Sequence, residues 1–279
     1  MSAIYADLHA HTTASDGEFS PEQLAEAAAA AGVKVLAVTD HDTTAGLVRA
    51  EARGKELGVE IIPGCELTAY LRGVELHILA YFFNPADGTP LAKLLEEVRQ
   101  KRRERALEMA ARLRAQGIEV SDQDVLDAAQ GADSIGKPHV GAAIVKRGHA
   151  GSVKGAMNKF LRNGMPACVP KLLLAPEQVF AAVRGAGGVT VLAHPGCAPH
   201  DELIAPLFRA GLDGVEAFHQ SHSDVNRRYY AGLARRYEKA VGGGSDFHGP
   251  RVKPGVTVGC SGVSEAQFED LHRRSASKR

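Results

Sequence analysis

The chain has 279 residues, 44% of them hydrophobic, and its 33 basic and 33 acidic side chains give a formal net charge of +0. This composition excludes wholesale disorder, and the charge balance argues against an overall basic nucleic-acid binder or a membrane-surface protein. No apolar run approaches the ~20 residues that span a bilayer, so we expect no membrane partner. The N-terminus lacks a signal-peptide pattern and the cysteines are scattered, so we expect a cytoplasmic protein. Nothing in the sequence implies a protein partner.

Short apolar runs along the chain predict seven β-strands. Several of these runs are nearly continuous, which suits strands buried on both faces of a parallel sheet. Helical patterns lie between many of them, including a helix capped by Ser20 and a second one at 44–57. Repeated strand–helix pairs predict an α/β fold with a parallel sheet or barrel. The predicted strands cover residues 4–9, 33–39, 59–63, 75–82, 188–194, 214–218 and 240–244.

The strand–helix alternation stops between about residues 89 and 174. A long helical pattern at 90–116 is followed by shorter ones near 121–129, 138–147 and 152–162. We therefore expect two parts: residues 1–88 and 175–279 form the catalytic barrel, and residues 89–174 form a helical insertion that covers the active site.

Many histidines and carboxylates lie at the ends of predicted strands, where sites assemble in parallel α/β folds and barrels. His9 and His11 are two residues apart on a strand, so both side chains face one side, as a chelating pair does. Imidazole and carboxylate donors without thiolates suit Mn, Zn or Fe(II). The nine candidate ligands are His9, His11, Asp16, His41, Glu66, His77, His194, Asp246 and His248.

Nine candidates are too many for one ion and imply two or three metals. Multinuclear centres of this kind activate a hydroxide and hold phosphoryl oxygens, so hydrolysis of a phosphate ester is the natural reaction. Asp40 lies beside a candidate ligand, and two roles stay open for it: it orients an imidazole or a water, or it caps a helix or forms a salt bridge.

These residues form a series of motifs in order from residue 4 to about 260. The motifs are Asp7-x-His9-x-His11, Asp16-Gly17, Thr39-Asp40-His41-Asp42, Gly64-x-Glu66, His77, His194-Pro195 and Ser245-Asp246-x-His248. Together they resemble the PHP superfamily (polymerase and histidinol phosphatase). The insertion, with Ile135-Gly136-Lys137-Pro138-His139, is similar to the branch of 3′,5′-nucleoside bisphosphate phosphatases and 5′→3′ oligoribonucleases.

The resemblance implies a distorted (β/α)7 barrel with a trinuclear metal centre, often loaded with manganese. By motif, one ion would be held by His9, His11 and Asp246. Glu66 would bridge it to a second ion, which His77 and His194 also hold. The third ion would be held by Asp16, His41 and His248. The catalytic residues would be His194, His248 and Asp246, with either histidine assisting the leaving alcohol.

Cationic side chains are concentrated after residue 98, and a phosphorylated substrate needs such cations. Residues 1–98 carry 6 basic and 15 acidic side chains, whereas residues 99–279 carry 27 basic and 18 acidic ones. A basic stretch opens the insertion, and a glycine-containing loop precedes a helix N-terminus, which suits an anion. The candidate substrate contacts are Arg102, Arg103, Arg105, Ser134, Lys137, Lys171 and His222.

The preferred function is a metal-dependent phosphoesterase that removes the 3′-phosphate from nucleoside 3′,5′-bisphosphates, for example adenosine 3′,5′-bisphosphate to AMP. The alternatives are 5′→3′ exoribonuclease action on short RNA, histidinol phosphate hydrolysis and, last, a non-enzymatic PHP module. The chain has no Trp and only 5% aromatic residues, which disfavours a long RNA-stacking surface.

Overall fold

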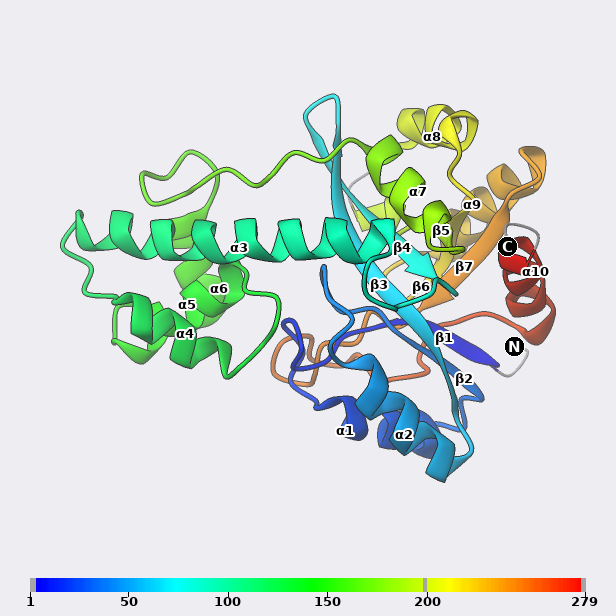
Figure 1. The fold of residues 1–279 in the computed structure, drawn as a ribbon, viewed down its shortest axis with the longest axis horizontal. Helices are drawn as coiled ribbons and strands as arrows, with labels where there is room; N and C mark the ends of the chain where they lie inside the picture. The colour runs from blue at the N-terminus through cyan, green and yellow to red at the C-terminus, as the bar shows by residue number, and fades with distance from the viewer. Residues whose placement is uncertain (1–3, 198–199, 277–279) are drawn as a thin grey trace.

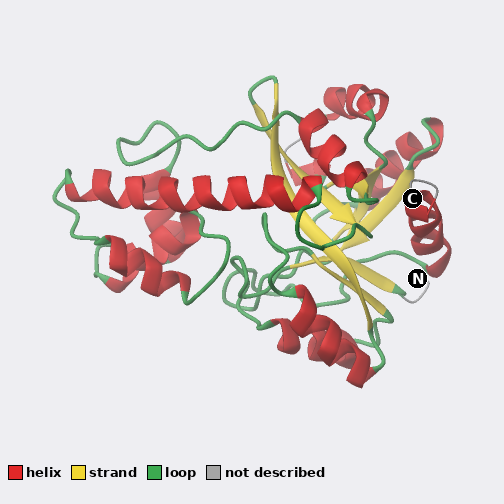
Figure 2. Cartoon of the chain, in the orientation of Figure 1, coloured by secondary structure: helices red, strands yellow, loops and turns green. Residues whose placement is uncertain are grey.

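In the computed structural model, residues 4–197 and 200–276 are described, and they contain a single seven-stranded sheet with the strands in chain order (Figures 1 and 2). Residues 1–3, where we expect no signal peptide, lie outside the described part. All seven predicted strands are present. They are β1 (Ala6–Ala10), β2 (Val35–Val38), β3 (Glu60–Leu71), β4 (Val74–Tyr81), β5 (Val189–Leu192), β6 (Gly214–His219) and β7 (Ala240–Gly244).

The direction of β4 differs from our expectation of parallel strands, which is wrong at this point. Strand β4 pairs antiparallel with both β3 and β5, whereas the other neighbouring pairs are parallel. The cause is local: Arg72 and Gly73 both have positive φ and join β3 to β4 in a two-residue hairpin turn. Glu66 and His77 therefore lie inside a long hairpin rather than at strand ends.

The two edges of the sheet approach each other, which confirms the distorted (β/α)7 barrel. The backbone N–H of Asp246, just after β7, donates to the carbonyl of His9 on β1 at 2.7 Å. The N–H of His11 likewise donates to the carbonyl of Phe247 at 2.9 Å. These bonds bring the ends of β1 and β7 together, and with them the residues that follow each strand.

Helices cover the outside of the sheet. Helix α1 begins with a complete capping box in which Ser20 and Gln23 satisfy each other's backbone N–H groups. Phe268 and Leu271 of the last helix pack into a core that also includes Leu8 and Tyr81 of the strands. These helices are α1 (Pro21–Ala30), α2 (Leu47–Leu57), α7 (Pro176–Gly185), α8 (Ile204–Ala210), α9 (Asp224–Arg236) and α10 (Glu265–Ala276), with 3-10 turns at Pro195–Cys197 and Asp201–Leu203.

The segment between β4 and α7 is helical, as expected, and Figure 1 shows it extending away from the sheet. The first half of α3 packs on the barrel core through residues such as Leu95 and Val98. Its second half builds a separate core with the following helices through residues such as Met109 and Leu113. The division of the chain at residues 89 and 174 stays a prediction, because α3 contributes to both cores. The helices are α3 (Pro90–Arg114), α4 (Asp122–Ala129), α5 (Lys137–Lys146) and α6 (Val153–Ala156), followed by a π-helical turn at Met157–Leu161.

Within the described part of the chain, the helices are either too short or too polar to cross a bilayer.

Candidate metal centre

The nine candidate ligands lie together in four overlapping groups. The potential ligand atoms within each group are within 4.8 Å of one another. Each group offers three or four donors, which is the number a protein uses to hold one ion. The groups are His11, Asp16, His41 and His248; His9, His11 and Glu66; His9, His194 and Asp246; and His41, Glu66 and His77.

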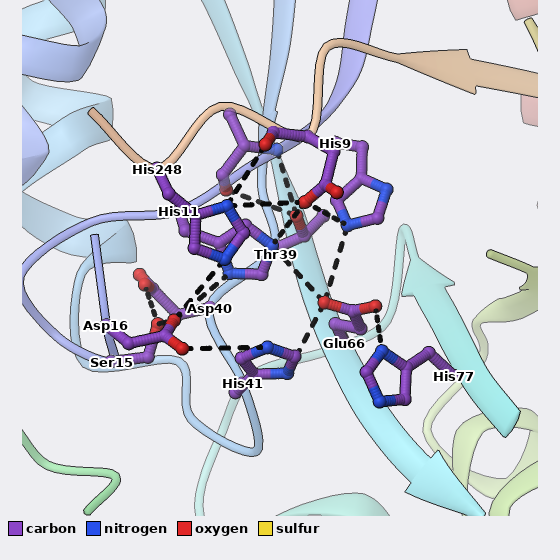
Figure 3. A network of polar contacts seen from close by, with 12 residues as sticks. His9, His11, Ser15, Asp16, Thr39, Asp40, His41, Glu66, His77 and His248 are labelled. Atoms are coloured by element: carbon purple, nitrogen blue, oxygen red, sulfur yellow. Dashed lines mark hydrogen bonds and ion pairs between the residues drawn. The ribbon is translucent and has the colours of Figure 1, made fainter. Parts of the chain in front are cut away.

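Glu66 lies in the middle of the cluster, as Figure 3 shows. Its carboxylate is 1% exposed and is reached by five imidazoles. Burial alone would raise its pKa, but the surrounding imidazoles, His41 and His77 first among them, hold the pKa well below its usual range. On Oε2 the neighbours are His9 (3.3 Å), His11 (3.2 Å) and His41 (3.3 Å), and on Oε1 they are His77 (2.8 Å) and His194 (3.2 Å).

The backbone around the cluster is specialised for close approach. A Cβ atom on Gly244 would lie 2.4 Å from the backbone N of His9, so glycine lets β7 come against β1. His194 and Asp246 have positive φ values of 27° and 53°, which non-glycine residues rarely adopt. Such backbone strain is typical of residues held in place for function.

Several buried nitrogen atoms in the cluster have no hydrogen-bond partner in the described part of the chain. They are Nε2 of His9, both ring nitrogens of His11 and Nδ1 of His41. A buried polar atom left unsatisfied costs ~1–3 kcal/mol, so native structures rarely keep several together. Imidazole lone pairs beside carboxylate oxygens, without thiolates, are the donors that Mn, Zn and Fe(II) take. The residues present therefore fit divalent metal ions.

Two residues support the cluster from β6: Glu216, which we did not single out from the sequence, and His219. The Glu216 carboxylate accepts from Nδ1 of His9 at 3.1 Å and from the backbone N–H of His194 at 2.6 Å. This contact fixes the ring of His9 with Nε2 toward Glu66. His219 contacts Oδ2 of Asp246 at 3.3 Å. The sequence did contain an indication of this role for Glu216, because a carboxylate inside a buried strand needs a polar partner.

The contacts of Asp40 in the structure match neither of the two roles left open for it. Its carboxylate accepts from the backbone N–H of Thr12 (2.8 Å), the hydroxyl of Thr12 (2.6 Å) and the hydroxyl of Ser15 (2.6 Å). Burial raises the pKa of Asp40, and these hydrogen bonds and the charge of His11 offset part of that rise. Asp40 therefore holds the loop that carries Asp16, and among the described residues its carboxylate is hydrogen-bonded to Thr12 and Ser15 rather than to an imidazole, a helix N-terminus or a Lys or Arg side chain.

A cavity of about 210 Å³ opens directly beside the cluster. One wall is formed by the candidate ligands Asp16, His41 and His77. The opposite wall comes from the helical segment, with apolar side chains such as Met157 and Leu172. Five cationic side chains also line it, namely Lys101, Arg102, Arg105, Lys137 and Lys171. The arrangement places cations and candidate metal ligands around one small space.

Protein groups hold these cations in defined positions. The guanidinium of Arg102 donates through Nη1 to Asp42 at 2.5 Å and through Nε to the carbonyl of Ile135 at 3.3 Å. A Cβ atom at Gly136 would lie 2.8 Å from Nη2 of Arg102, so a side chain there would displace the guanidinium. Arg105 donates to the carbonyl of Val169 at 2.8 Å.

The remaining three predicted substrate contacts do not line this cavity. Arg103 is exposed, because it follows Arg102 by one residue and points away from the face of α3 that carries Val98. Ser134 is fully buried. Both ring nitrogens of His222 bond to backbone groups, Nδ1 to the carbonyl of Ala217 and Nε2 to an N–H in the turn after β5, so this ring is structural.

Comparisons with known proteins agree with this architecture. The PHP domain family matches residues 7–145. The phosphoribosyl 1,2-cyclic phosphate 1,2-diphosphodiesterase of Eggerthella lenta is 36% identical over 87% of this chain and 94% of its own length. The 3′,5′-nucleoside bisphosphate phosphatase of Chromobacterium violaceum is 32% identical over 88% and 87%, and the 5′-3′ exoribonuclease Rnm of Escherichia coli is 33% identical over 89% and 86%.

A solved structure from Bifidobacterium adolescentis, described as a metal-dependent phosphoesterase, matches with a TM-score of 0.88 and 31% identity over 96% of both chains. These similarities extend over nearly the whole chain, and all of them concern hydrolases that cleave phosphate esters. The chain therefore belongs to the PHP domain family and is a metal-dependent hydrolase.

Proposed function

We propose that this chain removes a phosphate from a small nucleotide that carries a second phosphate, with nucleoside 3′,5′-bisphosphates as preferred substrates. The observation that carries the proposal is the shared cavity, in which candidate metal ligands and five cationic side chains face the same space. A substrate with one phosphate at the metals and another anionic group at the cations would use both walls. A substrate with a single phosphate would leave the cationic wall without a partner.

The nine clustered residues would hold the metal ions, three by our assignment, with manganese ahead of zinc and iron. Divalent ions there would activate a water and neutralise charge on the phosphoryl oxygens. Glu66 would contribute to more than one ion, because its two oxygens face different imidazoles. The group of Asp16, His41 and His248 proposed from the motifs is one of the clusters in the structure, with His11 added. Asp246 groups with His9, as proposed, and with His194.

A proton must reach the leaving alcohol, and His194 and His248 are the candidate donors. The ring of His194 is 21% exposed, whereas that of His248 is 8% exposed. We favour His194, because its ring is the more exposed of the two and lines a pocket together with His77, which also borders the cationic cavity.

The second phosphate of the substrate would bind Arg102, Arg105, Lys137 and Lys171. Arginine offers a planar group that can bond two phosphate oxygens together, whereas lysine acts as a point charge. The bonds of Arg102 to Asp42 and Ile135 use Nη1 and Nε and leave its other N–H groups for a ligand. A preorganised cation of this kind loses little side-chain freedom on binding.

The cavity is large enough for only part of a nucleotide substrate. Its volume of about 210 Å³ is below the ~300–1,000 Å³ of pockets that enclose drug-sized ligands. It has room for a phosphate and part of a sugar. A mononucleotide and a short RNA would both extend beyond it, and exoribonuclease activity ranks second because the chain has no Trp and only 5% aromatic residues on which bases could stack.

A panel of hydrolysis assays with Mn²⁺ tests the proposal, with chromatography measuring every product, because cleavage of a phosphodiester or of a cyclic phosphate frees no inorganic phosphate. The panel compares adenosine 3′,5′-bisphosphate, AMP, histidinol phosphate, a 5′-phosphorylated RNA trimer and phosphoribosyl 1,2-cyclic phosphate. We expect the highest kcat/KM for the bisphosphate and little release from AMP. A higher kcat/KM for the trimer, for histidinol phosphate or for the cyclic phosphate would refute the bisphosphate as the preferred substrate. An Asp16→Asn variant serves as the control for contaminating phosphatases.

A further inference from the structure

Glu75 lies at a junction between the metal cluster and the cationic wall of the cavity. It stands two residues before His77 on β4, so both side chains point to the same face of the strand. The tip of the β3–β4 hairpin meets the segment that returns from the helices to the barrel, since Tyr70 donates its backbone N–H to Leu174 at 2.7 Å. This placement brings Glu75 against Lys171 of the returning segment.

The carboxylate of Glu75 is shared by three side chains. Its Oε2 accepts from the hydroxyl of Tyr70 at 2.5 Å. Its Oε1 accepts from Nζ of Lys171 at 2.5 Å and contacts Nε2 of His77 at 3.2 Å. One oxygen therefore contacts both a candidate metal ligand and a candidate substrate cation.

The ring of His77 is held from both sides by carboxylates. Nδ1 faces Oε1 of Glu66 at 2.8 Å, inside the metal cluster, and Nε2 faces Glu75. A histidine that binds a metal through one nitrogen commonly donates its other N–H to a carboxylate, which fixes the tautomer and the orientation of the ring. Glu75 is in the position to do this for His77.

The ammonium of Lys171 also depends on Glu75. Burial lowers the pKa of Lys171, and the nearby charges of Arg102 and Arg105 lower it further, whereas Glu75 raises it. Without Glu75, three like charges would face one another across the cavity, and the flexible lysine could turn away from them. The carboxylate therefore supports a cation at the place where a substrate anion would bind.

We propose that Glu75 is a positioning residue that couples metal binding at His77 to substrate binding at Lys171. The role of Lys171 in this proposal rests on the proposed function. The effect of Glu75 on metal binding rests only on the geometry of His77. The tight contact with Tyr70 holds the carboxylate between its two partners. A substitution of Glu75 should therefore change both the affinity for Mn²⁺ and the KM for the substrate.

The test compares Glu75→Gln with Lys171→Gln and with Glu97→Gln, an exposed α3 carboxylate outside the cavity lining. Mn²⁺ affinity is measured without substrate by competition with a chromogenic chelator, and KM and kcat are measured in saturating Mn²⁺. We expect Glu75→Gln to weaken Mn²⁺ binding at least tenfold, as loss of a carboxylate behind a metal-binding histidine does, and to raise KM. Lys171→Gln should raise KM and leave Mn²⁺ affinity unchanged.

The proposal is overturned if Glu75→Gln binds Mn²⁺ as tightly as Glu97→Gln does, or if its KM equals that of the unsubstituted protein. Tyr70→Phe provides a second, milder variant should Glu75→Gln fold poorly, and it should shift Mn²⁺ affinity and KM in the same directions. Unchanged values for a folded Tyr70→Phe together with an unfolded Glu75→Gln would count against the coupling. Because the affinity measurement needs no substrate, it remains decisive even if the proposed substrate is wrong.

Discussion

Arg102 and Asp42 form the ion pair that links α3 to the barrel at the edge of the cavity. The pair is close, with Nη1 and Oδ2 2.5 Å apart, and the side chains of Arg102 and Asp42 are 19% and 1% exposed. The other carboxylate oxygen of Asp42 is buried without a hydrogen-bond partner in the described residues. Replacing Arg102 by Met therefore removes a phosphate contact and also leaves a buried carboxylate unpaired.

The two effects have separate magnitudes. Removing one member of a buried pair costs ~3–5 kcal/mol, and the partial exposure of Arg102 places our expectation for Arg102→Met at the lower end, about 3 kcal/mol of unfolding free energy. A charged hydrogen bond to substrate contributes about 2 kcal/mol, which corresponds to roughly a 30-fold loss of kcat/KM. In Arg102→Met the unpaired Asp42 would also repel the substrate anion, so the loss should be larger.

The double variant Arg102→Met/Asp42→Asn separates these effects. We expect it to recover most of the unfolding free energy in urea titrations, and part but not all of kcat/KM. Arg103→Met is the matched control, since Arg103 is exposed one residue away on the same helix, and it should change stability by less than ~0.5 kcal/mol. Equal kcat/KM values for Arg102→Met and Arg103→Met would refute the role of Arg102.

Three further outcomes follow, two from contacts around the site and one from an ion pair on the surface. Glu216→Gln should weaken Mn²⁺ binding ~10–100-fold, because the ring of His9 loses its carboxylate partner; chelator competition measures this. Asp40→Asn should lower the thermal midpoint and reduce phosphate release, because the loop carrying Asp16 loses charge-assisted hydrogen bonds; scanning calorimetry that shows an unchanged midpoint would contradict it. The arginine of α2 that pairs with Glu22 lowers the pKa of Glu22 to about 2, so the pair stabilises the fold above pH 4.5 and this contribution disappears as the pH falls toward 2. The side chains are partly exposed, so the difference between the native chain and Glu22→Gln should be only ~0.2–1 kcal/mol at pH 7, measured by urea unfolding, and should vanish near pH 2.

Much of the fold was predictable because its signals are local. Apolar runs and capping residues predicted each strand and most helices, and the structure contains them. The direction of β4 was not predictable in this way, since an apolar run has no direction. The strand predicted at 59–63 was also too short, because β3 continues to Leu71. Only Arg72 and Gly73 then join it to β4, too few residues for the crossover that a parallel pair requires.

The structure brings the nine predicted ligands together. Most of them lie at or just after the ends of barrel strands, which meet at one edge, whereas Glu66 and His77 reach the cluster from inside the β3–β4 hairpin. The supporting residues were harder to find. Glu216 and His219 lie on a strand whose register shifts between Glu216 and Phe218, so simple alternation does not show which side chains face the cluster.

Which arginines of α3 line the cavity depends on the face of the helix that each one occupies. Val98, Arg102 and Arg105 recur at spacings of four and three, so they share one face, and all three line the cavity. Arg103 falls outside that spacing and is exposed. Buried Val98 marks the relevant face, but its burial is known only once the helix is packed on the barrel.

The most direct test of the account is a metal titration of phosphate release. The protein is stripped with a chelator, Mn²⁺ is returned in steps, and release from adenosine 3′,5′-bisphosphate is followed beside bound metal measured by mass spectrometry. The account predicts no turnover in the stripped protein and full turnover as three ions bind per chain, with both lost in Glu66→Gln. Full turnover by the stripped protein, or by Glu66→Gln without bound metal, would contradict it.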